Sequence, residues 1–242
     1  MTARLADHGA WATPVYLDAR PITLTGVIAA PNRAARDGAI EQLISAVALT
    51  DTVLTIEETV PKQTTVRRSG ELVVEPLNSA GATYSALVTA ADPRRYSTVL
   101  QSQSTALPST SGGLVLPIVL PLTIGTTVSG GGFTLSNEGS IATRPTFTIT
   151  GPVASPIIAC TQPDGTVIRL AYADTLGDGD VLTIDCDAHT AMLPGPVSRR
   201  RYLSAQPTWP EVLPGSSLQV QWSASSYDPT ALLTGTCRSA WM

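Results

Sequence analysis

Alternating hydrophobic and polar positions recur along most of the chain, and this period of two predicts β-strands. In the first half the pattern predicts strands at residues 21–29, 53–57, 64–68, 72–75 and 82–89. Ser69 and Gly70 separate two of these runs, which predicts a β-hairpin at that point. In the second half strands are predicted at residues 114–123, 132–136, 146–150, 157–160, 167–172, 181–185, 201–204 and 218–222.

One segment has the helical period instead. Its apolar residues recur at intervals of three and four positions, at Ile40, Leu43, Ile44 and Val47. We therefore predict one amphipathic helix over about residues 34–49, with the apolar face on a sheet. Asn32 or Asp37 is available as its N-cap, and Asp51 closes it.

Residues 101–113 carry no charge, are rich in serine and threonine, and end in Gly-Gly. This composition is typical of a linker, so we expect the joint between two domains here. The first domain, residues 1–105, is then one helix on a small antiparallel sheet, and residues 106–113 are the linker. The second, residues 114–242, is an antiparallel β-sandwich, because short strands follow one another between Gly, Pro and Asp turns. Its last strand belongs either to this sandwich or, by returning, to the first domain.

The composition excludes several classes of protein. With 43% hydrophobic and 14% charged residues among 242, the chain is too apolar to be disordered. Its formal charge is −4 and Lys62 is its single lysine, so it lacks the basic surface that nucleic-acid binding needs. The longest apolar run, residues 114–124, is about half the ~20 residues of a membrane-spanning helix. We expect neither a membrane segment nor a secretory signal.

The three cysteines, Cys160, Cys186 and Cys237, are odd in number and far apart. This spacing is typical neither of a disulfide framework nor of a zinc site, so we expect buried free thiols. Cys160 or Cys186 could pair with His189 as a thiol dyad. Cys186 adjoins a predicted strand, however, where a structural thiol is far commoner.

The densest acidic patch consists of Asp178, Asp180, Asp185, Asp187 and His189. The last three stand two positions apart, so a strand would place them on one face. A divalent cation is conceivable there, but the spacing does not fit an EF-hand loop. A tight Asp/Gly turn next to a solvent-facing strand edge explains the same residues, and we expect no metal.

No other pattern indicates catalysis. The chain has no Gly-x-Ser-x-Gly motif, and His8 and His189 lie outside any triad context. Glu57 and Glu58 would point to opposite faces of a strand, which does not suit paired carboxylates. The glycines at 130–132 lead into a strand rather than a helix, so they form no phosphate loop. We predict no catalytic, cofactor-binding or metal-binding residues, and a structural or binding role.

Exposed aromatic rings could still bind a sugar, because β-sandwiches often stack sugars on them. Trp209, Trp222 and Trp241 gather near the C-terminus. Packing in the core or at an interface is the favoured interpretation of these rings. A carbohydrate-binding β-sandwich that contacts the host surface is kept as the alternative function.

Four motifs of the second half are similar to those of a known protein family. They are SNEGSIATRPTFTITGP at 136–152, PIIACTQPDGTVIRL at 156–170, GDGDVLTIDCDAHTAML at 177–193 and LPGSSLQVQW at 213–222. This pattern resembles the distal tail proteins of long-tailed bacteriophages, in particular the minor tail proteins of actinobacterial phages. The segment ARPITLTGVIAAP before the helix is similar to the family's ring-forming domain. Two departures are Ser217, where the family usually has Asn, and the short stretch of about 19 residues before that segment.

The resemblance implies a tail-tube-like β-sandwich or split barrel with one helix, followed by a galectin-like antiparallel β-sandwich. It also implies a structural virion protein at the distal end of the tail, assembled in the host cytoplasm. In such a protein a homo-hexameric ring connects the tail tube protein to the tail-tip hub and leaves a channel for DNA in transit. The tape measure protein is a further partner, and no enzyme activity, cofactor or membrane is implied.

Overall fold

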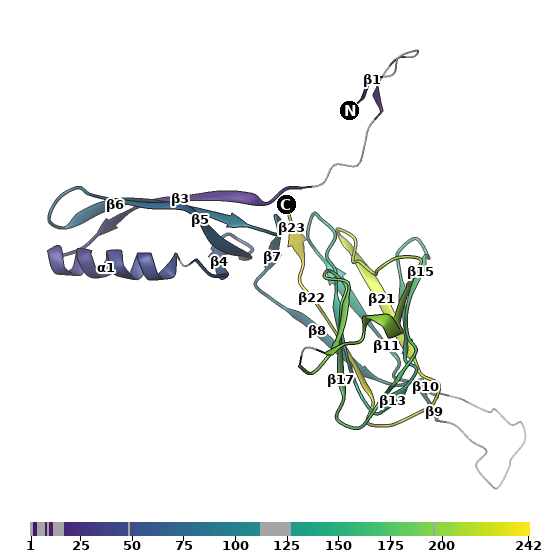
Figure 1. Ribbon diagram of the computed structural model, residues 1–242. Helices are drawn as coiled ribbons and strands as arrows, with labels where there is room; N and C mark the ends of the chain where they lie inside the picture. The colour runs from purple at the N-terminus through teal and green to yellow at the C-terminus, as the bar shows by residue number, and fades with distance from the viewer. Residues whose placement is uncertain are drawn as a thin grey trace, which may run out of the picture. The chain divides into compact units, whose positions relative to one another are not determined.

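The computed structural model describes residues 2–3, 8, 10–11, 17–47, 49–111, 127–195 and 197–242. The chain divides into two compact units, Met1–Arg95 and Tyr96–Met242 (Figure 1). Both units are built from antiparallel strands, and the described residues contain one α-helix. The predicted fold class, mainly β with one helix in the first half, is confirmed. The strand predicted at 114–123 lies outside the described residues.

The first unit is a twisted antiparallel sheet with α1 on one face (Figure 1). Strand β6 lies between β3 and β5, and the short β4 pairs with the beginning of β5. A separate pair, β1 and β2, precedes this sheet. The elements are β1 (Thr2–Ala3), β2 (Ala10–Trp11), β3 (Arg20–Ala29), α1 (Arg33–Ala46), β4 (Thr52–Ile56), β5 (Lys62–Pro76) and β6 (Gly81–Ala90).

The predicted helix is confirmed, with Asn32 as its N-cap. The Asn32 side chain accepts a hydrogen bond from the backbone N–H of Ala35 at 2.9 Å, which satisfies a donor of the first turn. The helix ends at Ala46, several residues before Asp51, and the N–H of Val47 closes it on the carbonyl of Leu43. Among the described residues, no helix is long and apolar enough to cross a membrane.

The predicted hairpin at Ser69 and Gly70 is wrong, because β5 runs through these residues as one strand. Its register against β6 shifts between Arg68 and Leu72, as at a β-bulge. A Cβ at Gly70 would lie 3.0 Å from the Cβ of Leu87, so glycine lets the two strands approach closely. A Gly inside an apolar run therefore marks a bulge here rather than a turn. The actual hairpin joins β5 to β6 through residues 77–80.

The first unit has a thin core on the side of α1. Its buried residues are Val47, Val66, Ala86, Val88 and Ala90. Ile22, Leu24 and Leu43 pack against them while staying partly exposed. Alternate residues of the strands point to the other face of the sheet, where Val27, Val73 and Leu87 are exposed. In the described part of this unit, helix α1 covers only one of the two faces of the sheet.

The second unit is a sandwich of two antiparallel sheets. One sheet has the order β11-β21-β14-β15-β20 and the other β19-β18-β17-β12-β22-β8. The strands of the first sheet are β11 (Gly132–Asn137), β14 (Ile157–Thr161), β15 (Val167–Tyr172), β20 (Leu203–Gln206) and β21 (Ser216–Ser223). Those of the second are β8 (Gln101–Ala106), β12 (Thr146–Thr150), β17 (Val181–Asp185), β18 (Thr190–Leu193), β19 (Val197–Ser198) and β22 (Leu232–Cys237).

Shorter elements complete this unit and its boundary. They are β7 (Arg95–Ser97), β9 (Ser109–Ser111), β10 (Thr127–Ser129), β13 (Val153–Ala154), β16 (Thr175–Leu176), the 3-10 turn η1 (Arg200–Tyr202) and β23 (Ala240–Trp241). The predicted strands at 146–150, 167–172 and 181–185 are confirmed to the residue. The segment predicted as a strand at 201–204 begins as η1 and becomes extended only at Leu203.

The core of the sandwich lies between the inward faces of its two sheets. Phe147 and Ile149 of β12 alternate with half-buried threonines, and Leu218, Val220 and Trp222 alternate with exposed residues of β21. Such alternation is expected when one face of a sheet is buried and the other is solvated.

The expectation of a domain joint within the uncharged segment 101–113 is wrong for the first half of that segment. Residues 101–106 form β8, which pairs with β22 over its whole length, and the boundary between the units falls between Arg95 and Tyr96. Serine and threonine suit an edge strand with one solvated face, and Ser104 and Thr234 share a cross-strand hydrogen bond of 2.8 Å. An edge strand and a linker therefore have the same composition here, and composition does not distinguish them.

The Asn137-Glu138-Gly139 motif closes one end of the sandwich. The Asn137 amide is buried; it donates to the carbonyls of Ile141 (2.8 Å) and Val212 (3.0 Å). Its oxygen accepts from the N–H groups of Gly139 (2.9 Å) and Ala240 (3.1 Å). A Cβ at Gly139 would overlap the backbone of Ala240, so only glycine allows this approach.

Replacing Asn137 by Ala is expected to destabilise the protein by about 3 kcal/mol, because several buried backbone groups lose their partner at once. Chemical denaturation followed by tryptophan fluorescence measures the loss. The control is Asn78→Ala, whose exposed side chain accepts one bond from Ala80. Equal stability of the two variants would contradict the role of Asn137.

A fragment of residues 96–242 is expected to fold by itself, whereas a fragment of residues 107–242 is expected to melt about 10 °C lower or more. The shorter fragment lacks β8 and exposes the edge of β22. Circular dichroism melts of the two fragments test this. Coincident melting curves would show that β8 is dispensable, as a linker would be.

Candidate functional site

The acidic residues of the second unit form turns rather than a ligand set. Strand β17 ends at Asp185, whose carboxylate accepts hydrogen bonds from the N–H groups of Asp187 (2.8 Å) and Ala188 (2.9 Å). The backbone of His189 is left-handed, with φ of 56°. The expectation that Asp185, Asp187 and His189 share a strand face is therefore wrong, because a turn intervenes.

The preceding turn uses Asp180 in the same way. Its carboxylate accepts from the N–H of Gly177 at 2.8 Å, and Gly179 has φ of 77°. Within the described ranges, no three His, Cys, Asp or Glu side chains gather closely enough to hold a metal ion. Turn formation accounts for these carboxylates, and the absence of a bound metal stays a prediction.

The three thiols are free and buried. Burial raises the pKa of Cys160 to about 12 and that of Cys237 to about 11, and it raises the pKa of Cys186 well above 9.0. A nucleophilic cysteine needs a thiolate near neutral pH, which these environments oppose. The structure therefore favours the structural interpretation over a Cys186–His189 dyad.

Glu57 and Glu58 follow β4 and do not lie on a strand, contrary to the sequence prediction. Glu58 contacts Lys62 and Arg95. The hydrogen bond and charge of Lys62, followed by the charge of Arg95, hold the pKa of Glu58 below its usual value. This carboxylate is thus ionised and paired, which does not suit a general acid.

Two of the three tryptophans near the C-terminus, Trp209 and Trp222, have structural contacts. Trp222 is buried and donates from Nε1 to the carbonyl of Ala106 at 3.0 Å. The ring of Trp209 stacks on His189 with 4.6 Å between centroids, and the guanidinium of Arg200 lies 5.0 Å from its centroid. Arg200 also donates to the carbonyl of His189 at 3.1 Å. Through these contacts the ring of Trp209 holds the turn at His189 against the sandwich.

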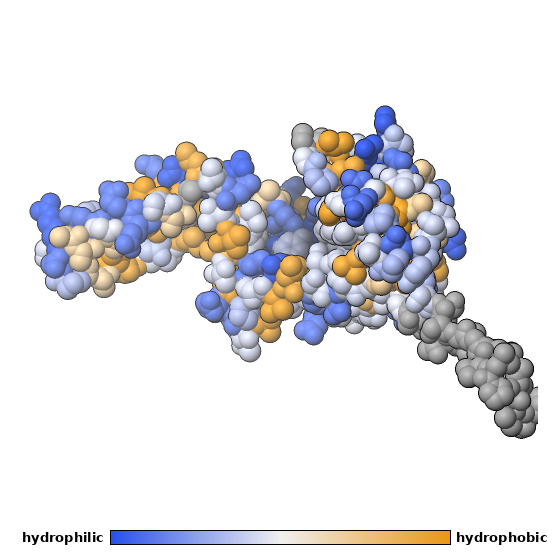
Figure 2. Space-filling model, turned by 90° about the horizontal axis from the view of Figure 1, so that it is seen from below, coloured by the Kyte–Doolittle hydropathy of each residue, from blue (hydrophilic) through white to orange (hydrophobic). Residues whose placement is uncertain are grey.

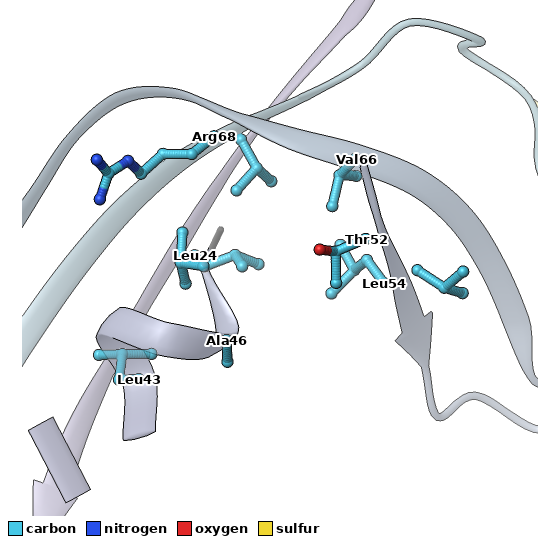
Figure 3. Close-up of a pocket in the computed structure, with 10 residues that line it drawn as sticks. Leu24, Leu43, Ala46, Thr52, Leu54, Val66 and Arg68 are labelled. Atoms are coloured by element: carbon cyan, nitrogen blue, oxygen red, sulfur yellow. The ribbon is translucent and has the colours of Figure 1, made fainter. Parts of the chain in front are cut away.

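The first unit contains a groove that the sequence prediction missed. It has a volume of about 260 Å³ and lies between the end of α1, strand β4 and the sheet (Figure 3). Leu43 and Ala46 approach it from the helix, Thr52 and Leu54 from β4, and Leu24 and Val66 from the larger sheet, with Val47, Val53, Arg68 and Val88 completing the wall. Figure 2, which views the molecule from the side of α1, shows hydrophobic residues gathered on this face.

Arg68 is the one charged residue of this groove. Its half-buried side chain extends past Leu24 (Figure 3), and its guanidinium makes no hydrogen bond or ion pair within the described ranges. Side chains alternate between the two faces of β5, and Arg68 lies on the helix side, as does Val66 two residues earlier. In the sequence, the feature that could have indicated this site is a charged residue at a strand position where the alternating pattern expects an apolar one.

Comparison with known families gives a match to the second unit. Residues 138–232 match the family model described as siphovirus-type tail component, C-terminal domain. No curated protein sequence matches the chain.

Two solved structures are similar in fold. The crystal structure of the Dit protein of phage SPP1, described as a paradigm of the hub adsorption apparatus in phages infecting Gram-positive bacteria, has a TM-score of 0.63 and 12% identity. The match covers 100% of this chain and 86% of that protein. A chain of the phage P2 baseplate, in its activated conformation with Ca, has a TM-score of 0.47 and 8% identity over 90% of this chain and 78% of that one.

Residues 138–232, which form most of the sandwich described above, are thus similar to the C-terminal domain of siphovirus-type tail components. Over its whole length the chain is similar in fold to the SPP1 Dit protein, and part of its second unit matches a tail-component family. The resemblance found in the sequence is confirmed.

Unfolding should depend on the buried thiols at high pH. The folded chain keeps the proton of Cys160 up to about pH 12, whereas an unfolded chain releases it near pH 9.0. This contribution to stability is complete below pH 9 and declines as the pH rises towards 12, by about 1.4 kcal/mol per pH unit.

Denaturant unfolding between pH 8 and 11 measures this decline in the wild type and in Cys160→Ala. The stability of the variant is expected to fall less steeply with pH, from a lower starting value. Parallel curves would show that Cys160 ionises equally in both states.

Proposed function

We propose that six copies of this chain close into a ring at the distal end of the phage tail, where the ring connects the tail tube to the tail-tip hub. The observation that carries this proposal is the SPP1 Dit fold, which extends over the whole chain and joins both units in one order. That protein is described as a paradigm of the hub adsorption apparatus.

The first unit supports the assignment of the ring to this part of the chain. Its core is thin, and one face of its sheet leaves Val27, Val73 and Leu87 exposed. A head-to-tail interface that closes by rotation would cover such surface and stabilise the unit at the same time. The sandwich, by contrast, has a larger core of its own, in which Phe147, Leu182 and Leu233 are fully buried.

The remaining partners follow from position in the tail. The tail tube protein lies on one side of such a ring and the tail-tip hub on the other, with the tape measure protein as a further neighbour. DNA passes through the ring in transit only. The net charge of −4 suits a channel that does not retain phosphates.

A structural role without turnover also agrees with the chemistry of the described residues. Protonated thiols, a paired Glu58 and turn-forming aspartates each have a structural explanation. Carbohydrate binding has weaker support, because Trp222 is buried and Trp209 already contacts His189 and Arg200.

Electron microscopy of tails that contain this protein tests the proposal. A six-fold ring between tube and tip, labelled by an antibody or a tag on this chain, is the expected result. A ring of another symmetry, or this chain scattered along the tail surface, would refute it. A glycan array with the purified protein tests the carbohydrate alternative separately, and we expect no specific binding.

A further inference from the structure

The tip of the β5–β6 hairpin presents an apolar side chain on a hydrogen-bonded turn. Leu77 is 61% exposed, although its N–H donates to the carbonyl of Gly81 at 2.9 Å. The side chain of Asn78 accepts from the N–H of Ala80, and Arg36 of α1 donates to the carbonyl of Asn78. The backbone around Leu77 is therefore held in place while its side chain projects from the protein.

A carboxylate accompanies this apolar tip. Glu75 is exposed two residues before Leu77, and it makes no ion pair within the described ranges. The groove at the other end of the unit has the complementary pair of features, an apolar wall and the unpaired Arg68. The hairpin tip and the groove both lie in the first unit, on opposite sides of Ala86 along β6.

The tip cannot fill the groove of its own chain. Gly81 lies near the tip and Val88 lines the groove, seven positions further along β6. At about 3.3 Å per residue this amounts to roughly 23 Å. The size of the groove, about 260 Å³, is also below the range of about 300–1,000 Å³ for small-molecule sites, and it suits one or two protein side chains.

We propose that the hairpin tip of one copy docks into the groove of the next copy, with Leu77 among the apolar side chains and Glu75 paired with Arg68. This inference rests on the ring of the proposed function and names the contact that closes it. Each copy offers one tip and one groove at opposite ends, so the contact is head-to-tail and can repeat around a closed ring. The ion pair sets the register, since opposite charges at a contact select one alignment.

A disulfide trap tests the contact directly. Leu77→Cys and Val53→Cys, the latter at a groove residue that is 56% exposed, are combined in one full-length chain. Diamide accepts the two hydrogen atoms of each thiol pair as one S–S bond forms between copies. The expected product is a ladder of linked chains up to six, at concentrations where the wild type assembles or in assembled tails.

The controls separate this contact from chance collisions. Each single-cysteine variant is expected to give dimers at most, and the native thiols are buried. The combination of Leu77→Cys with Leu100→Cys, which is 50% exposed outside the groove, is expected to give no ladder. A dimer without higher species from the Leu77/Val53 pair would overturn the head-to-tail contact in favour of a two-fold one.

Charge reversal tests the ion pair. Arg68→Glu and Glu75→Arg are each expected to raise the concentration at which rings form about tenfold or more, because like charges then meet at the contact. The double variant is expected to regain assembly. Glu71→Arg, at an exposed position four residues before Glu75, is the control and is expected to assemble as the wild type does.

The outcomes distinguish this contact from the ring itself. Rings that persist unchanged in both single charge variants, together with no ladder, overturn the contact and leave the proposed function standing. A ladder that ends at a number other than six supports the contact and contradicts the hexamer. Loss of assembly in the double variant as well as in the single ones overturns the pairing of Glu75 with Arg68.

Discussion

The arrangement of the sandwich depends on one buried amide. Asn137 binds the backbone at Gly139, Ile141, Val212 and Ala240, and these residues come from parts of the chain about a hundred positions apart. Each of its amide hydrogens and its oxygen has a partner, so no polar group of this side chain is buried without compensation. Because Gly139 leaves space for the backbone of Ala240, the same turn connects the end of β11 to the last residues of the second unit.

The two units differ in how completely they bury their apolar surface. The sandwich encloses Phe147, Leu182 and Leu233 between two sheets, and it needs no partner for its own core. The sheet of the first unit has one helix on one face and exposed valine and leucine on the other. Because burial of apolar surface is the main source of stability, such a unit gains most from assembly. This difference agrees with a ring built by the first unit.

The residues that were candidates for catalysis or ligand binding have structural roles instead. Aspartates 180 and 185 accept backbone hydrogen bonds in turns, and the thiols remain protonated because charge is disfavoured in the core. Trp209 holds the turn at His189 through stacking. The unpaired Arg68, in contrast, borders an apolar groove, and this combination is what directs attention to a protein partner rather than to a substrate.

The sequence by itself determined several strands of the sandwich, among them β12, β15 and β17, the position of the helix and the resemblance to distal tail proteins, because alternation and turn motifs are local signals. Only the tertiary structure decided three further features. Residues 101–106 are a strand because β22 offers a free edge, Gly70 is a bulge because Leu87 lies opposite it, and Asp185 begins a turn rather than extending β17. The groove at Arg68 likewise requires α1, β4 and β5 to meet, and contacts between residues distant in the chain leave little trace in local sequence.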